Sequence, residues 1–187
     1  MSARAKSQAG TTVLGRPVVR QQAQWSTAID GPPPALAGFV GSEFSPLLAA
    51  AADRCLAACY PDRPVPAGER IALVLVSGSG DRVSAAQVRH SIAGSRRIGP
   101  LYFFQSVPNS VAGWIAAHWG LGGPVLCLCP VADPLADGLA EAALLISDGD
   151  ADQVLLLLVE QAGAVDDLAH SGTDQAHAWL VVAGDAE

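Results

Sequence analysis

The sequence predicts an α/β fold, a layered sheet flanked by helices. Uninterrupted apolar runs such as Ile71–Val76 and Val154–Val159 are typical of strands that are buried on both faces. Helical patterns of ten or more residues separate the expected strands, which favours right-handed crossovers wherever neighbouring strands are parallel. The chain has 187 residues, 50% of them hydrophobic and 16% charged, so it is long enough for one domain with a sizeable core.

Each expected element follows from its local pattern. Residues 1–24 carry four basic residues and no acid, so we expect a flexible basic leader there, with Val13–Val19 as an alternative edge strand, and one domain over residues 25–187. Ser45-Pro46 begins a helix that stops at Tyr60. The later elements are a strand at Ile71–Val76, helices at Val83–Ile92 and Pro108–Trp119, a buried strand at Pro124–Cys129, a helix at Pro134–Ser147, and strands at Asp152–Val159 and Ala176–Val182.

Charge is divided unevenly along the chain. The 11 basic and 18 acidic residues give a net charge of −7, yet residues 133–187 contain 12 of the acids and no Arg or Lys. The acidic total, and the lack of aromatic residues among the basic ones, disfavour nucleic acid as a partner. An anionic partner could still meet a cluster of four arginines, Arg82, Arg89, Arg96 and Arg97.

Membrane insertion is not expected. The apolar runs fall far short of the roughly 18 residues that span a bilayer, and residues 1–24 are polar where a signal peptide would be apolar. We therefore expect a cytoplasmic protein.

Metal and cofactor motifs are weak. The pairs Cys55/Cys59 and Cys127/Cys129 lack the spacing of a zinc knuckle and are expected to be buried thiols. The glycine-rich turn Ser77–Asp81 lacks the further residues of a phosphate loop. No cofactor is expected, because ligand spacing is also missing around the histidines and around a short acidic turn: His90, His118, His170 and His177, and Asp148, Asp150 and Asp152.

A longer stretch, Ile98–Glu160, carries an ordered series of short motifs. They are a proline in an aromatic loop, N-x-V-A-G, G-L-x-G-P, a strand, a helix, G-x-A-D and a strand ending in Glu, found at Pro100, Asn109–Gly113, Gly120–Pro124, Val125–Val131, Pro134–Ser147, Gly149–Asp152 and Val154–Glu160. This series resembles the amino-terminal, thiolase-like half of the β-ketoacyl synthase family. The resemblance implies half of a thiolase-like fold, with a mixed, mostly parallel sheet and Pro134–Ser147 as its buried central helix.

Two departures from the family pattern bear on catalysis. Family spacing places the nucleophilic cysteine at Ala132, where a methyl group cannot attack a thioester. The chain also ends where a second half, which supplies two histidines, should begin. The resemblance, together with S-V-x-N-x-x-A-G at Ser106–Gly113, therefore implies a non-catalytic subunit like a chain length factor of type II polyketide or aryl-polyene pathways. Such a subunit pairs with a β-ketoacyl-ACP synthase, completes its acyl tunnel and helps to set chain length in polyketide, polyene or fatty-acid-like biosynthesis.

The same resemblance implies where partners bind. In related synthases the strand that leads to the cysteine position lies at the dimer interface. The expected ketosynthase interface is Asn109, Val125, Leu126, Leu128 and Val131, and the expected tunnel gate is Tyr102, Phe103 and Phe104. Arg89, Arg96 and Arg97 form an expected patch for the acidic acyl carrier protein or for the partner subunit.

Two other classes of function stay open. One is an acyltransferase or hydrolase with another nucleophile, for which Cys127, Cys129 and Asp133 are the candidates. The other is a homodimeric structural protein without a ligand. Acyl loading of the isolated chain would reveal the first, and size analysis with and without a ketosynthase would reveal the second.

Overall fold

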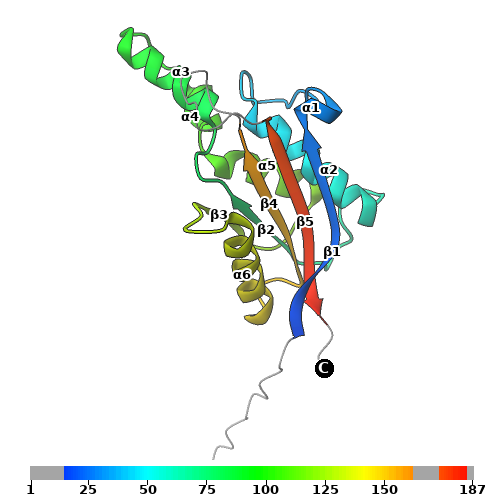
Figure 1. The fold of residues 1–187 in the computed structure, drawn as a ribbon. Coiled ribbons are helices and arrows are strands. Elements are labelled where there is room, and N and C mark those ends of the chain that lie inside the picture. The colour runs from blue at the N-terminus through cyan, green and yellow to red at the C-terminus, as the bar shows by residue number, and fades with distance from the viewer. Residues whose placement is uncertain (1–14, 162–172, 185–187) are drawn as a thin grey trace, which may run out of the picture.

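A five-stranded sheet runs through the computed structural model, which describes residues 15–161 and 173–184 (Figure 1). The described elements follow in the order β1 (Gly15–Ser26), α1 (Thr27–Asp30), α2 (Phe44–Cys59), β2 (Ile71–Val76), α3 (Arg82–Ala93), α4 (Pro100–Gln105), α5 (Pro108–Trp119), β3 (Val125–Leu128), α6 (Pro134–Ser147), β4 (Gln153–Glu160) and β5 (Gln175–Gly184). Within the same residues, none of the helices has the length and apolarity needed to cross a membrane.

The sheet is mixed, and its strand order is β1-β5-β4-β2-β3. Strand β2 pairs in parallel with both β3 and β4, whereas β5 pairs antiparallel with β4 and β1. Four of the five strands therefore run in one direction, and only β5 runs against them. This arrangement confirms the predicted α/β fold with a mixed, mostly parallel sheet.

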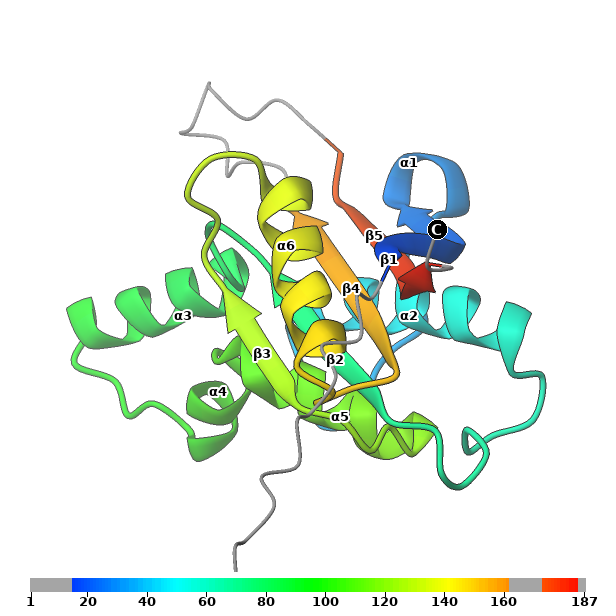
Figure 2. The same ribbon diagram turned by 90° about the horizontal axis from the view of Figure 1, so that it is seen from below.

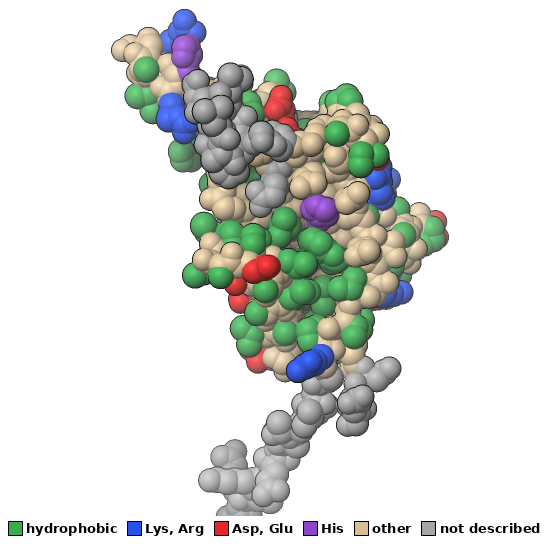
Figure 3. Space-filling view, in the orientation of Figure 1, with side chains coloured by type: hydrophobic (Ala, Val, Ile, Leu, Met, Phe, Trp, Pro, Cys, Tyr) green, Lys and Arg blue, Asp and Glu red, His purple; other side chains and the backbone are tan. Residues whose placement is uncertain are grey.

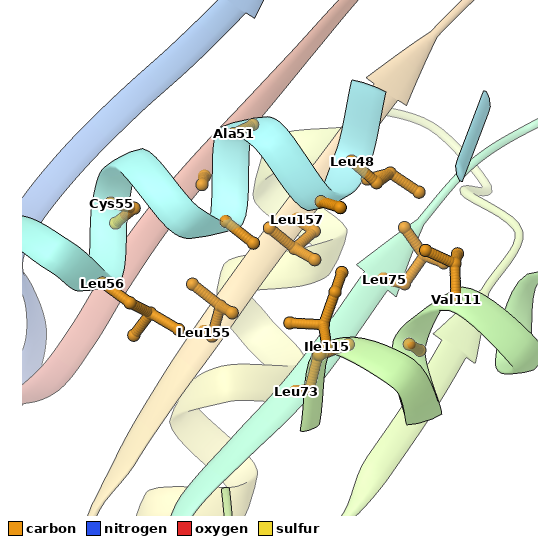
Figure 4. Packing of buried hydrophobic residues seen from close by; sticks show 14 of the residues in the cluster. Leu48, Ala51, Cys55, Leu56, Leu73, Leu75, Val111, Ile115, Leu155 and Leu157 are labelled. Atoms are coloured by element: carbon orange, nitrogen blue, oxygen red, sulfur yellow. The ribbon is translucent and has the colours of Figure 1, made fainter. Parts of the chain in front are cut away.

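The central strands β2 and β4 are buried on both faces, which explains their uninterrupted apolar sequences. Alternate side chains point toward α2 and α5 on one face and toward α6 on the other, as the three layers in Figure 2 show. Figure 4 shows Leu73 and Leu75 of β2 meeting Leu155 and Leu157 of β4 beneath α2 and α5. On the opposite face, Ala72, Val74, Val76, Val154 and Leu156 pack against α6.

Strand β1 corrects the prediction of a leader over residues 1–24. Residues 15–24 belong to β1, which pairs along β5 from Gly15↔Gly184 to Ser26↔Gln175. The alternative prediction, an edge strand at Val13–Val19, had the correct position for the start of β1. An edge strand is half solvated, so β1 contains polar residues and lacks the continuous apolar run that marks a buried strand. Residues 1–14 lie outside the described part of the chain.

Three further elements differ from the sequence predictions. The strand predicted to be buried at Pro124–Cys129 is the shorter β3, which lies at the sheet edge with Val125 41% exposed. The aromatic segment predicted as a loop is the short helix α4. Helix α6 buries only one side, because Leu135 and Leu144 of the predicted central helix are exposed.

The turn after β2 holds the neighbouring helices in place. The Ser77 backbone N–H donates to the carbonyl of Leu128, which ties the end of β2 to the end of β3. Asp81 is buried and caps α3, because its carboxylate accepts from the Ser84 N–H at 2.8 Å and from the Ser84 hydroxyl at 2.7 Å. The same carboxylate accepts from the Ser42 hydroxyl at 2.7 Å, which links the cap to the segment before α2.

Candidate functional site

The turn between β3 and α6 contains the predicted nucleophile position. Ala132 is exposed and directly precedes Asp133, the N-cap residue of α6. The Asp133 side chain accepts from the Ala136 N–H at 2.8 Å. One helical turn further on, Asp137 Oδ2 accepts from two backbone N–H groups of the turn, those of Val131 at 2.7 Å and Ala132 at 3.2 Å. Two carboxylates therefore surround the position where the family pattern expects a cysteine.

The cysteines and Asp133 offer little nucleophilic chemistry at this turn. Cys127 is half-buried, and burial raises the pKa of its thiol to about 11, so the thiol stays protonated at neutral pH. Cys129 is exposed, which corrects the prediction that it is buried, because β3 ends one residue before it. Cys55 is buried as predicted, with its pKa raised by burial to about 12, and Cys59 is only half-buried. The carboxylate of Asp133 is engaged as a helix cap.

Strand β3 leaves one edge without a neighbour in the described sheet. β3 is the last strand in the order of the sheet, so β2 pairs with the backbone groups along only one of its two edges. Val125 is 41% exposed and Val131, in the turn after the strand, is 96% exposed. Leu126 and Leu128, also predicted at the interface, are half-buried and pack with the residues around α6.

Helix α4 has an inverted pattern of burial. Its amide side chain, Gln105, is buried and donates from Nε2 to the Val40 carbonyl at 2.9 Å. Its aromatic side chains face solvent: Tyr102 is 36% exposed, Phe103 76% and Phe104 52%. A helix in water normally buries its apolar side chains and exposes its polar ones, so α4 reverses the usual pattern.

The three aromatic residues of α4 differ in their surroundings. Phe104 packs partly on Phe39, with ring centroids 5.9 Å apart. Tyr102 lines a groove of about 690 Å³ beside α3. Phe103 has the largest exposed fraction of the three side chains. The Ser110 hydroxyl donates to the Phe104 carbonyl at 2.6 Å, which fixes α4 against the start of α5.

The β3 edge and α4 lie on the same side of the molecule. Figures 1 and 2 both show α3 and α4 on the β3 side of the sheet, and α5 packs against β3. We call this surface the β3–α4 face and define it by exposed residues of α4, of α5, of β3 and of the following turn: Leu101, Tyr102, Phe103, Phe104, Asn109, Val125 and Val131.

The predicted arginine patch lies on the projecting helix α3 and on the segment after it. Arg89, Arg96 and Arg97 are all exposed, and none of the ion pairs within residues 15–161 and 173–184 involves them. Figure 3 shows Lys or Arg side chains and a histidine on this projecting part of the molecule.

Sequence reasoning missed the role of Asp137. Acidic residues are common in the first turn of a helix, where they interact favourably with the helix dipole, so Asp137 did not stand out in the sequence. Only the fold of the turn shows that this carboxylate reaches back to the N–H groups of residues 131 and 132.

Comparisons with solved structures find the same fold among ketosynthases. A complex of the ketosynthase ApeO with its chain length factor ApeC from Xenorhabdus doucetiae matches with a TM-score of 0.66 and 23% identity, over 82% of this chain and 62% of that chain. The ishigamide ketosynthase/chain length factor matches with a TM-score of 0.73 and 18% identity, over 92% and 63%. A type II polyketide synthase complex of the acyl carrier protein AntF with its ketosynthase AntDE matches with a TM-score of 0.68 and 16% identity, over 91% and 63%.

The chain therefore spans slightly less than two thirds of the length of these solved chains. Among curated proteins, no sequence matches it. A sequence family, by contrast, matches most of the chain: residues 46–184 fit the β-ketoacyl synthase N-terminal domain. The match includes the strands β2 to β5, the turn at Ala132 and helix α4. The chain accordingly belongs to the β-ketoacyl synthase family, as a form of its N-terminal domain.

Proposed function

We propose that this chain is a non-catalytic subunit, similar to a chain length factor, that pairs with a β-ketoacyl-ACP synthase. It completes the acyl tunnel of its partner and helps to set product length in type II polyketide, polyene or fatty-acid-like biosynthesis. The observation that carries the proposal is the inverted burial of α4, which exposes Phe103 and Phe104 and buries Gln105. The fold shared with complexes of ketosynthase and chain length factor supports the choice of partner.

The β3–α4 face has two features that suit a permanent complex. The free edge of β3 offers backbone N–H and C=O groups to a strand of another subunit. The exposed apolar side chains of α4 and Val131 offer a hydrophobic contact next to that edge. A stable subunit interface commonly buries well over about 1,000 Å² in total, which requires contacts beyond a four-residue strand. Helix α4 supplies such contacts.

The chemistry of the β3–α6 turn supports a non-catalytic role. Ala132 occupies the predicted nucleophile position, and the thiol of Cys127 has its pKa raised to about 11 by burial. An acyltransferase that used one of the alternative nucleophiles would need an activating base or a lowered pKa. The surroundings of Cys127 instead raise the pKa of its thiol, which makes it a weaker nucleophile at neutral pH.

Two smaller surfaces complete the proposal. Tyr102, Phe103 and Phe104 gate the tunnel, with at least one ring projecting toward the acyl pocket of the partner. Arg89, Arg96 and Arg97 contact an acidic acyl carrier protein or the partner subunit. A long acyl chain needs apolar space, and each buried methylene is favoured by about 0.8 kcal/mol, so a smaller gate residue admits longer products.

The decisive experiment is co-expression with any ketosynthase that is encoded beside this chain. We expect a heterodimer by light scattering, and we expect Val125→Lys to weaken it while Ile29→Lys, at an exposed position of α1, does not. Mass spectrometry of the products should show longer chains for at least one of the Ala variants at the three gate positions. A chain that stays monomeric or forms only homodimers in the presence of the ketosynthase would refute the proposal.

A further inference from the structure

The turn between β3 and α6 lacks a nucleophile, and two of its backbone N–H groups are already bound by a carboxylate. Asp137 Oδ2 lies 2.7 Å from the Val131 nitrogen and 3.2 Å from the Ala132 nitrogen, so one carboxylate oxygen accepts both hydrogen bonds. Within the first turn of α6, the Ala136 N–H is taken by Asp133 at 2.8 Å. Residue 134 is a proline and has no N–H.

The N–H groups of Val131 and Ala132 lie at the nucleophile position and directly before it, where an acyl-transfer site at this turn could use them as donors. When a thiolate adds to a thioester carbonyl, the new C–S bond forms and the carbonyl oxygen becomes an oxyanion. The original C–S bond then breaks, and the leaving thiolate takes a proton from water. Backbone N–H groups beside the nucleophile ordinarily stabilise that oxyanion. A carboxylate already bound to them competes with the oxyanion and repels its charge.

We infer that Asp137 closes the vacant turn to acyl groups by occupying the N–H groups of Val131 and Ala132 with a fixed negative charge. The inference rests on the proposed function in one respect, because it treats Ala132 as the vacant nucleophile position. It adds that the loss of acyl transfer is set by two residues of this chain, Ala132 and Asp137. Restoring a thiol alone therefore leaves the site closed.

The arrangement also predicts how an introduced thiol would behave. A cysteine before the N-terminus of a helix ordinarily has a lowered pKa, because the helix dipole stabilises the thiolate. At position 132 the carboxylate of Asp137 opposes this effect, since it is bound to the N–H of that same residue. A carboxylate this close has the same sign of charge as a thiolate and raises the pKa of the thiol by about one unit or more. One unit lowers the thiolate fraction at neutral pH about tenfold.

The test compares four variants of the full chain in a Cys129→Ser background, which removes the exposed cysteine. They are Ala132→Cys alone and Ala132→Cys combined with Asp137→Asn, Asp137→Leu or Glu141→Gln. Glu141 is the matched control, because it is an acid one turn further along α6 and also half-buried. Two rates at the introduced thiol are measured and assigned by peptide mass spectrometry: alkylation by iodoacetamide between pH 6 and 10, and acylation by acetyl-CoA.

We expect both Asp137 variants to speed alkylation at neutral pH about tenfold relative to Ala132→Cys alone, and the Glu141 control to leave it unchanged. Acylation should rise most with Asp137→Leu, because the amide oxygen that Asp137→Asn retains can still accept the two N–H groups. Equal rates in all four variants, each folded by circular dichroism, would overturn the inference. The near-isosteric Asn variant keeps the test valid if the Leu variant does not fold.

The isolated chain suffices for these measurements. A failure to pair with a ketosynthase would remove the proposed function and leave the rates untouched. Conversely, equal rates would remove the role of Asp137 and leave pairing untouched.

Discussion

Truncating Phe103 to alanine should separate the stability of the chain from the stability of its complex. Phe103 is 76% exposed in the single chain, so Phe103→Ala removes few internal contacts. A Phe side chain can bury about 200 Å², of which about 150 Å² is still free here. At about 25 cal/mol per Å², full burial against a partner contributes about 4 kcal/mol, or half of that if the contact is partial. The dissociation constant should therefore rise between about thirtyfold and a thousandfold.

Titration calorimetry of the purified subunits measures this dissociation constant, and urea unfolding measures the stability of the chain alone. Ile29→Ala is the matched control, because Ile29 is 77% exposed in α1, next to β1 and the opposite sheet edge. The control should bind as the parent chain does. For both variants the free energy of unfolding should change by less than about 1 kcal/mol. Binding by Phe103→Ala within twofold of the parent would show that α4 is not in the interface.

Three further predictions concern packing, charge and pH. Gly138→Ala should destabilise the chain by about 1–3 kcal/mol in urea unfolding, because the new Cβ would lie 2.5 Å from Leu156 Cδ1 in the core, whereas Gly113→Ala in α5, with nothing within 4 Å, should be neutral or stabilising. Reversing all three charges of the patch, Arg89, Arg96 and Arg97, should lower product formation by the complex about tenfold at low salt and much less at high salt. Burial lowers the pKa of His177 below its ordinary 6.5, so the folded chain binds fewer protons, and its stability should fall as the pH drops through 6.5; His177→Gln should flatten that part of the pH profile.

The sequence predicted the elements that bury continuous apolar surface. Strand β2, α5 and α6 were all predicted with their observed ends. The two helices each begin at a proline, and a glycine or a polar residue follows each of the three elements. The sequence predicted only the start of β1, as an alternative edge strand, because the polar edge residues further along β1 lack a strand signal. It did not predict α4, whose short aromatic sequence after Pro100 resembles a loop. The hydrogen bonds of Asp137 depend on how the turn folds, and no periodicity in the sequence encodes that geometry.

The wrong predictions about burial share one physical cause. Apolar sequence predicted that β3 and α6 are buried, yet Val125 of β3 and Leu144 of α6 are 41% and 54% exposed. Helix α4 likewise exposes apolar surface, since its aromatic residues face solvent. Figure 3 also shows hydrophobic side chains gathered over the sheet beside α6. An apolar sequence indicates that a segment is suited to contact other apolar surface, but it does not indicate whether that surface belongs to the same chain. For β3 and α4 the proposed ketosynthase supplies that neighbour, so their protection from hydrogen exchange should rise on pairing, while β2, already buried on both faces, should change little.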